Sequence, residues 1–298
     1  MQLCQPPAPL QPGDLLTVIA PSGALRELTA FDQGVKIWRD RGYQVELSPG
    51  FDDRWGYLAG SDHQRRQQLH NALTHPQCRG ILCARGGWGG ARLLEDWHWP
   101  LTEPKWLIGF SDITSLLFGL SQQGISGVHA PLLTTLGSEP DWSVHRLFDW
   151  VEGRSIAPLP GKGWGQGQTT GLLLPANLTV ATHLIGTSLQ PDLADGVILA
   201  LEDVGEAPYR IDRMLTQWRL SGLLPQVKGI ALGRFSQCDP PPNIPSFTVE
   251  QVLRDRLGDL GIPIVSELPF GHDGVNAALP VGVMAHLDGD QGFLTVKS

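Results

Sequence analysis

The sequence predicts an α/β protein of two domains: an N-terminal doubly wound, mostly parallel sheet of the Rossmann-like or flavodoxin-like kind, followed by a smaller mixed α/β domain. Three observations predict this fold. Short apolar runs alternate with helical patterns, Gly-rich turns join them, and a Gly- and Pro-rich stretch interrupts the pattern near the middle of the chain. We expect the N-terminal domain over residues 1–152, a linker over 153–171 and the C-terminal domain over 172–298.

The first half of the chain alternates strands and helices. Residues 15–20 form a short apolar run between turn residues, which is typical of a buried strand. Apolar residues then recur at helical spacing over 26–41, and a second strand is expected at 43–47. Ser61, with Gln64 three residues later, forms a capping box that begins the next helix. Further strands are expected at 80–84 and 105–110, and a helix at 112–123.

The second half begins after the Gly- and Pro-rich stretch. A helix is expected over 177–186, and 197–201 is a continuous apolar strand. Pro208 stands at a favourable first position of a helix whose apolar stripe ends before Gly222. Further short strands are expected at 229–232, 262–265, 281–287 and 293–296.

The charge balance and the cysteines exclude several functions. The chain has 22 Lys and Arg against 30 Asp and Glu, a formal net charge of −8, which argues against binding nucleic acid through its phosphates. No apolar stretch reaches the roughly 18 residues of a membrane span, and no secretory signal is visible, so we expect a cytoplasmic protein. The 4 cysteines suit neither a disulfide scaffold nor a zinc site, and we expect no metal.

Ser111 is the candidate nucleophile. It follows an apolar strand and precedes a helix, so its hydroxyl is expected at the carboxyl edge of the sheet, where open α/β folds place their sites. Helix N-terminal amides there can stabilise an oxyanion. The segment 109–113 resembles a nucleophile elbow without its final glycine. The competing interpretation is an ordinary helix N-cap, a position that Ser favours.

A serine nucleophile needs a base, and the base needs an orienting carboxylate. Of the 9 histidines, His129 and His272 lie in turn-rich segments, and His272 follows an apolar strand between Gly and Pro residues. Glu202 follows a fully apolar strand, where partial desolvation suits an orienting partner. The competing interpretations are a loop histidine bonded to backbone and a carboxylate that complements a helix dipole. Asp203 and Glu206 are the weaker carboxylate candidates.

A Gly-rich turn over 85–90 follows another predicted strand, and its amides can form an anion-binding nest. Arg92 stands where a dinucleotide fingerprint needs its third glycine, which disfavours NAD. The P-loop and the H-E-x-x-H zinc motif are both absent. We therefore expect no organic cofactor.

Six segments in order resemble the serine L,D-carboxypeptidase family, peptidase family S66, which includes muramoyl-tetrapeptide carboxypeptidases and microcin C immunity hydrolases. The resemblance covers nearly the whole chain. One departure is Pro175-Ala176-Asn177-Leu178, where the family pattern has Gly-Gly-Asn-Leu. Trp88 replaces the usual Tyr of the Gly-rich turn. The matching segments are 13–23, 57–62, 84–89, 108–114, 201–213 and 268–272.

The resemblance implies a role for each candidate residue. Ser111 corresponds to the nucleophile, Glu202 to the acid and His272 to the base. The oxyanion hole would come from the backbone amide of Asp112 and from that of Gly86 or Gly87. The family also implies a homodimer and the release of terminal D-alanine from the L-centre of a diamino acid in murein tetrapeptides, during cell-wall recycling.

Two alternatives stay open. The microcin-type branch implies hydrolysis of peptidyl- or aminoacyl-adenylate analogues, and Trp164 could stack an adenine there. A function of another class is a non-catalytic two-domain protein that binds a small ligand. The acidic composition also leaves open which cation holds an anionic peptide, and Arg85 and Arg210 are the two candidates.

Overall fold

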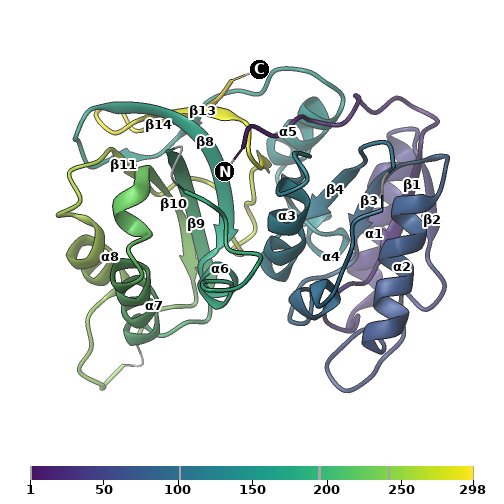
Figure 1. The fold of residues 1–298 in the computed structure, drawn as a ribbon, viewed down its shortest axis with the longest axis horizontal. Helices are drawn as coiled ribbons and strands as arrows, with labels where there is room; N and C mark the ends of the chain where they lie inside the picture. The colour runs from purple at the N-terminus through teal and green to yellow at the C-terminus, as the bar shows by residue number, and fades with distance from the viewer. Residues whose placement is uncertain (1, 101, 194–195, 241, 298) are drawn as a thin grey trace. The chain divides into compact units, whose positions relative to one another are not determined.

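The computed structural model describes residues 2–100, 102–193, 196–240 and 242–297 (Figure 1). The chain forms two compact units. The N-terminal unit comprises Cys4–Ile156 and Ala277–Val281, and the C-terminal unit comprises Ala157–Asn276 and Gly282–Ser298. In the described part of the chain, no helix is both long and apolar enough to cross a membrane.

The N-terminal unit contains a six-stranded sheet in the order β12-β5-β4-β3-β1-β2. Five strands are parallel, and only the edge strand β12 is antiparallel. The strand order 2-1-3-4-5 is flavodoxin-like. It confirms the predicted doubly wound, mostly parallel sheet. The strands are β1 (Leu15–Ile19), β2 (Gln44–Leu47), β3 (Cys78–Cys83), β4 (Trp106–Gly109), β5 (Val128–His129) and β12 (Leu279–Pro280).

Two helices of the N-terminal unit begin and pack as their local sequence patterns predict. Helix α1 buries Phe31, Val35 and Trp38, the apolar positions at helical spacing. Helix α2 begins with the predicted capping box, in which the Ser61 hydroxyl accepts from the Gln64 N–H. The helices are α1 (Leu28–Asp40), α2 (Asp62–Thr74), α3 (Thr114–Ser121), α4 (Leu133–Leu136) and α5 (Asp141–Val151), with 3₁₀ turns η1 (Ala91–Leu94) and η2 (Ser111–Ile113).

The C-terminal unit contains an eight-stranded mixed sheet in the order β6-β14-β13-β8-β9-β10-β11-β7. Its four central strands, β8 to β11, are parallel. Helix α7 packs beside α6 and α8 (Figure 1). The strands are β6 (Leu159–Pro160), β7 (Lys162–Gly163), β8 (Gln168–Asn177), β9 (Val197–Val204), β10 (Val227–Ser236), β11 (Ile264–Ser266), β13 (Met284–Asp288) and β14 (Phe293–Val296). The helices are α6 (Leu178–His183), α7 (Pro208–Leu220), α8 (Val249–Leu257) and the 3₁₀ turn η3 (Leu224–Gln226).

Part of the predicted linker belongs to this sheet. Strands β6 and β7 pair with β14 and β11, and β8 begins at Gln168. Pro160 is tolerated in β6 because β6 is an edge strand, where a missing N–H costs no ladder hydrogen bond. The Gly and Pro residues of 153–171 therefore mark short edge strands as well as turns.

Two further boundaries differ from the prediction. The strand predicted at 197–201 continues to Val204, because β8 and β10 pair with it through Glu202 and Asp203. Residues 277–281 join the N-terminal unit, where β12 pairs with β5. Glu202 thus lies inside a strand, not after one.

Candidate active site

Ser111 lies at the carboxyl end of β4 in a strained turn. Phe110 is extended, and Ser111 has a φ of 65°, a left-handed conformation that is uncommon for residues other than glycine. Such backbone strain costs about 1–3 kcal/mol and clusters at functional sites. Phe110, not Ser111, occupies the N-cap position of η2. The local geometry therefore resembles a nucleophile elbow more than an ordinary helix cap.

Gly86 packs directly against Ser111. A Cβ on Gly86 would lie 3.0 Å from the Ser111 Cβ and 3.2 Å from its Oγ. Gly87 has a φ of 113° and lies against Gly23. Among the described residues, none accepts a hydrogen bond from the N–H of Gly86, Gly87 or Asp112. These three amides are the predicted candidates for an oxyanion hole, and no described residue already occupies them as an acceptor.

Buried polar side chains hold this turn in place. The carboxylate of Asp112, only 3% exposed, accepts from the Ser22 hydroxyl at 2.5 Å and from the Gly90 N–H at 2.7 Å. Burial raises the pKa of Asp112, although these hydrogen bonds oppose the shift. The fully buried guanidinium of Arg65 donates to the carbonyls of Pro21 and Gly89. We call residues 85–90 with Ser111 and Asp112 the nucleophile turn, after the role predicted for Ser111.

Glu202 and His272 form a hydrogen-bonded pair in the C-terminal unit. The His272 Nδ1 lies 2.6 Å from the Glu202 Oε2. The Glu202 side chain is fully buried, whereas the imidazole is 17% exposed. Burial lowers the pKa of His272, but the hydrogen bond and negative charge of Glu202 outweigh it, so that the net pKa is raised above 6.5. Glu202 therefore engages the Nδ1 of His272 and fixes the orientation of the imidazole ring.

The loop that carries His272 is held against the end of β10. Phe270 accepts from the Arg234 N–H at 2.8 Å, and Arg234 forms an ion pair with Asp273 at 3.0 Å. Gly271 has a φ of 144°, and a Cβ there would lie 3.0 Å from the Arg234 Cβ. Both the backbone conformation and the lack of space therefore require a glycine directly before His272.

Asn177 supports the same pair, a role that the sequence analysis missed. It ends β8, caps α6, and donates from Nδ2 to Glu202 at 3.2 Å and to Asp203 at 3.1 Å. The two preceding residues, Pro175 and Ala176, are paired in β8 and have no positive φ, so the loss of the family's glycines leaves this strand intact. The sequence signal that could have identified this residue is an Asn directly before an apolar helix, a position where Asn favours the N-cap.

Asp203, treated above as a weaker candidate, has a structural role. It is buried and accepts from the N–H and the hydroxyl of Thr179, at 2.9 and 2.8 Å. Burial raises the pKa of Asp203, and the hydrogen bonds from Thr179 oppose this. The other weaker candidates lie elsewhere: Glu206 pairs with Arg210 at 3.3 Å, and His129 is buried in β5 against Phe110.

Trp164, the candidate for stacking an adenine, is engaged within its own unit. Its indole N–H donates to the Ser266 hydroxyl at 2.8 Å, and the Arg254 guanidinium lies 4.5 Å from its ring centroid. These contacts anchor the segment between β7 and β8 to the C-terminal sheet.

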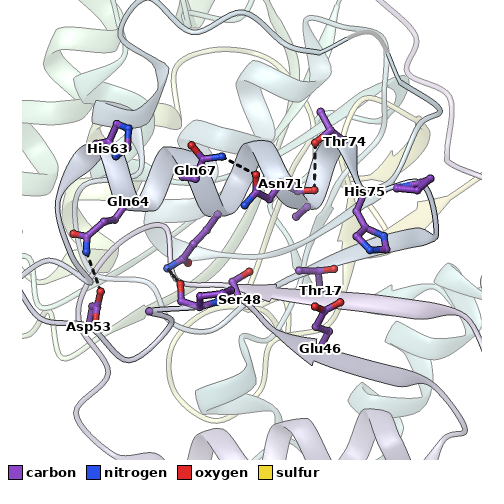
Figure 2. A pocket seen from close by; sticks show the side chains of 15 residues that line it. Thr17, Glu46, Ser48, Asp53, His63, Gln64, Gln67, Asn71, Thr74 and His75 are labelled. Atoms are coloured by element: carbon purple, nitrogen blue, oxygen red, sulfur yellow. Dashed lines mark hydrogen bonds between the residues drawn. The ribbon is translucent and has the colours of Figure 1, made fainter.

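A hollow of about 800 Å³ in the N-terminal unit is separate from the nucleophile turn. It lies between α2 and the strands β1 and β2, and most of the residues that line it are of polar types (Figure 2). Figure 2 shows Gln67 bonded to Asn71 on the helix and Thr17 and Glu46 on the strands below it. No predicted site residue lines this hollow.

Comparison with known proteins bears on the function. The sequence profile of the LD-carboxypeptidase N-terminal domain matches residues 16–130, and that of the LD-carboxypeptidase C-terminal domain matches 170–287. The chain is 61% identical over 290 residues to the "Putative carboxypeptidase slr1534" of Synechocystis sp., covering 97% of this chain and 96% of that protein. It is 31% identical to the murein tetrapeptide carboxypeptidase of Pseudomonas aeruginosa, covering 93% and 94% of the two chains.

Solved structures show the same fold. The muramoyltetrapeptide carboxypeptidase of Oxalobacter formigenes superposes with a TM-score of 0.84 at 29% identity, covering 95% of this chain and 97% of that chain. The structure of MccF in complex with glutamyl sulfamoyl guanosine superposes with a TM-score of 0.87 at 20% identity, covering 100% and 99%. The second likeness concerns the fold alone.

The fold and these relatives define the class of the protein, a serine-type carboxypeptidase built from two α/β units. More particularly, the chain belongs to the LD-carboxypeptidase family, peptidase family S66, as the resemblance of its six segments predicted.

Proposed function

We propose that the protein releases terminal D-alanine from murein tetrapeptides, with Ser111 as nucleophile, His272 as general base and Glu202 as its orienting partner. The observation that carries this proposal is the 2.6 Å hydrogen bond between His272 and the buried Glu202. A neutral imidazole whose Nδ1–H is held by a carboxylate has its Nε2 lone pair available for a serine proton. The relatives in Pseudomonas and Oxalobacter are named for murein and muramoyl tetrapeptides.

The reaction follows from these groups. His272 Nε2 takes the proton of the Ser111 hydroxyl while Oγ attacks the carbonyl carbon of the diamino acid. The negative oxygen of the tetrahedral intermediate accepts from the amide of Asp112 and from that of Gly86 or Gly87. The imidazolium then protonates the leaving amine of D-alanine. Water, deprotonated by His272, hydrolyses the acyl-enzyme and restores Ser111, and Glu202 stabilises the imidazolium in both steps.

Neither a metal nor an organic cofactor enters this proposed reaction. Assembly as a homodimer and a cytoplasmic location are part of the same proposal. They rest on the family resemblance and on the sequence, and size-exclusion chromatography with light scattering tests the dimer.

The decisive experiment measures D-alanine released from a purified muramoyl tetrapeptide. A tetrapeptide ending in L-alanine is the matched control substrate, and we expect release only from the D-alanine peptide. Absence of D-alanine release at micromolar enzyme would overturn the proposal. Turnover of either peptide would also exclude a purely ligand-binding function.

Hydrolysis of aminoacyl-adenylate analogues is the second candidate function. Its support is the fold of MccF, which extends over the whole chain. The engagement of Trp164 by Arg254 and Ser266 leaves less of its ring for an adenine. Assaying an aminoacyl sulfamoyl adenosine on the same preparation separates the two candidates, and we expect the tetrapeptide to be the better substrate.

A further inference from the structure

The N-terminal sheet changes direction between β1 and β3. From β1 the chain proceeds to β2 on one side, and from β3 it proceeds to β4 on the other. The carboxyl ends of two such strands border a crevice in which open α/β proteins bind ligands. The segments that follow β1 and β3 meet there, since the Gly23 N–H donates to the Gly86 carbonyl at 3.0 Å.

Arg85 lies just past the carboxyl end of β3, at this edge of the sheet. It is the second residue after β3 and directly precedes Gly86, which packs on Ser111. Its guanidinium lies over the Gly23 backbone, where a Cβ would come within 2.4 Å of Nη1. Nη1 donates to the Ala24 carbonyl at 3.1 Å. The cation is therefore held at the start of the nucleophile turn, against the backbone of Gly23 and Ala24.

No described residue neutralises the charge of Arg85. Among the described residues, no carboxylate lies within ion-pair distance of its guanidinium, and its Nε and Nη2 donate to no acceptor. The side chain is only partly exposed. Burial, and then the positive charge of Arg26, lower the pKa of Arg85. A half-buried cation without a counter-ion is unfavourable unless a ligand supplies the anion.

The other candidate, Arg210, differs in each respect. It is exposed on α7, its Nη1 forms an ion pair with Glu206 at 3.3 Å, and its Nε donates to the Tyr209 hydroxyl at 3.1 Å. The charge of Arg210 is therefore already paired within the protein. The structure favours Arg85 over Arg210.

We propose that Arg85 binds a carboxylate of the substrate through its Nε–Nη2 edge. This inference rests on the proposed function and identifies how an acidic protein recognises an anionic peptide. A guanidinium presents two parallel donors that match a carboxylate. Two carboxylates of a murein tetrapeptide are near the bond to be cleaved: the terminal one of D-alanine, and the side-chain one of a carboxylated diamino acid.

The test combines three substrates with two variants. The substrates are the tetrapeptide, the same peptide ending in D-alaninamide, and the same peptide with lysine in place of the carboxylated diamino acid. R85Q removes the charge, and R85K keeps the charge but loses the two-donor edge. R210Q is the matched control and should leave every rate unchanged.

We expect R85Q to lower kcat/KM for the tetrapeptide about 30- to 100-fold, because the variant loses the hydrogen bonds between the charged guanidinium and the carboxylate. If the terminal carboxylate is the one bound, R85Q leaves the rate on the D-alaninamide peptide unchanged and lowers that on the lysine peptide. If the side-chain carboxylate is bound, the pattern is reversed. An equal loss on all three peptides, or no loss on any, would overturn the proposal.

A binding measurement separates failure of this inference from failure of the proposed function. Calorimetric titration of S111A with the tetrapeptide and with the D-alaninamide peptide needs no turnover. When R85Q is added to S111A, we expect the affinity to fall only for the ligand that carries the recognised carboxylate. Equal affinities of S111A and of the double variant S111A/R85Q for the tetrapeptide would contradict the role of Arg85, even if the wild type releases D-alanine. Should R85Q not fold, R85K supplies the same comparison with a smaller expected loss.

Discussion

The two units hold their reactive groups in different ways. In the N-terminal unit, the nucleophile turn is shaped by backbone: Ser111 has a positive φ, and Gly86 leaves no room for a side chain. In the C-terminal unit, the proposed base is held by side chains: His272 bonds to Glu202, which in turn accepts from Asn177. A nucleophile fixed by backbone should be sensitive to an added methyl group, whereas a base fixed by side chains should be sensitive to a lost acceptor.

The largest expected effect is that of Ser111→Ala. Because no other group in the proposed reaction forms the covalent intermediate, we expect kcat to fall by at least about 10⁴-fold. The backbone conformation is available to Ala as much as to Ser, so the midpoint of thermal unfolding should change little. Release of D-alanine is the measurement, and Ser121→Ala, at the end of α3, is the control that keeps full activity. Retained activity in Ser111→Ala would sink the triad assignment.

Glu202→Gln should be nearly as damaging. The amide keeps the shape of the carboxylate but cannot stabilise an imidazolium, and it favours the wrong tautomer of His272. We expect kcat to fall about 10³- to 10⁴-fold with the fold intact, as judged by circular dichroism. Glu206→Gln, which changes an ion pair with Arg210 on the surface, is the matched control. Equal activities of the two variants would show that Glu202 does not orient the base.

These two residues also show how far sequence reasoning extends. Ser111 and His272 follow apolar runs between turn residues, and such runs predict where a strand ends because the signal is local. Glu202 was found by the same rule even though its strand continues two residues further. The positive φ of Ser111 was not predictable, since it depends on how Gly86 and Asp112 pack around it.

Contacts between distant segments explain what the sequence did not reveal. Pro160 of β6 pairs with Phe293 of β14, and Leu279 of β12 pairs with His129 of β5 in the N-terminal sheet. Because the partners of both edge strands are far away in the sequence, no local pattern of residues predicts either strand. Arg65 lies on a helix of low apolar content but is fully buried, because the carbonyls that it binds come from two other loops. Buried polar partners of this kind require the three-dimensional structure.

Gly86→Ala tests the backbone side of the comparison. The added Cβ would lie 3.0 Å from the Ser111 Cβ, so the hydroxyl must shift, and a displacement of this size can lower kcat about 10²-fold. Gly80→Ala is the control, since it is a glycine of the preceding strand β3 whose Cβ would meet the movable end of the Leu16 side chain at the same 3.0 Å. Both variants are measured for kcat and for thermal unfolding. If Gly80→Ala lost as much activity as Gly86→Ala, the close packing on Ser111 would not be the cause.

The pH dependence tests the side-chain half of the comparison, and its effect is the smallest. Glu202 raises the pKa of His272 above 6.5 against the opposing effect of burial, and His272 must be neutral to accept a proton. The acid limb of kcat/KM should therefore lie above pH 6.5, with activity lost as the pH falls through it. In Glu202→Gln the residual activity should show this limb at lower pH, because burial then dominates. Gly86→Ala, which displaces the Ser111 hydroxyl, should lower the plateau of kcat/KM and leave the pH of its acid limb unchanged. If the acid limb moved in Gly86→Ala but not in Glu202→Gln, the titrating group would not be the His272 that Glu202 holds.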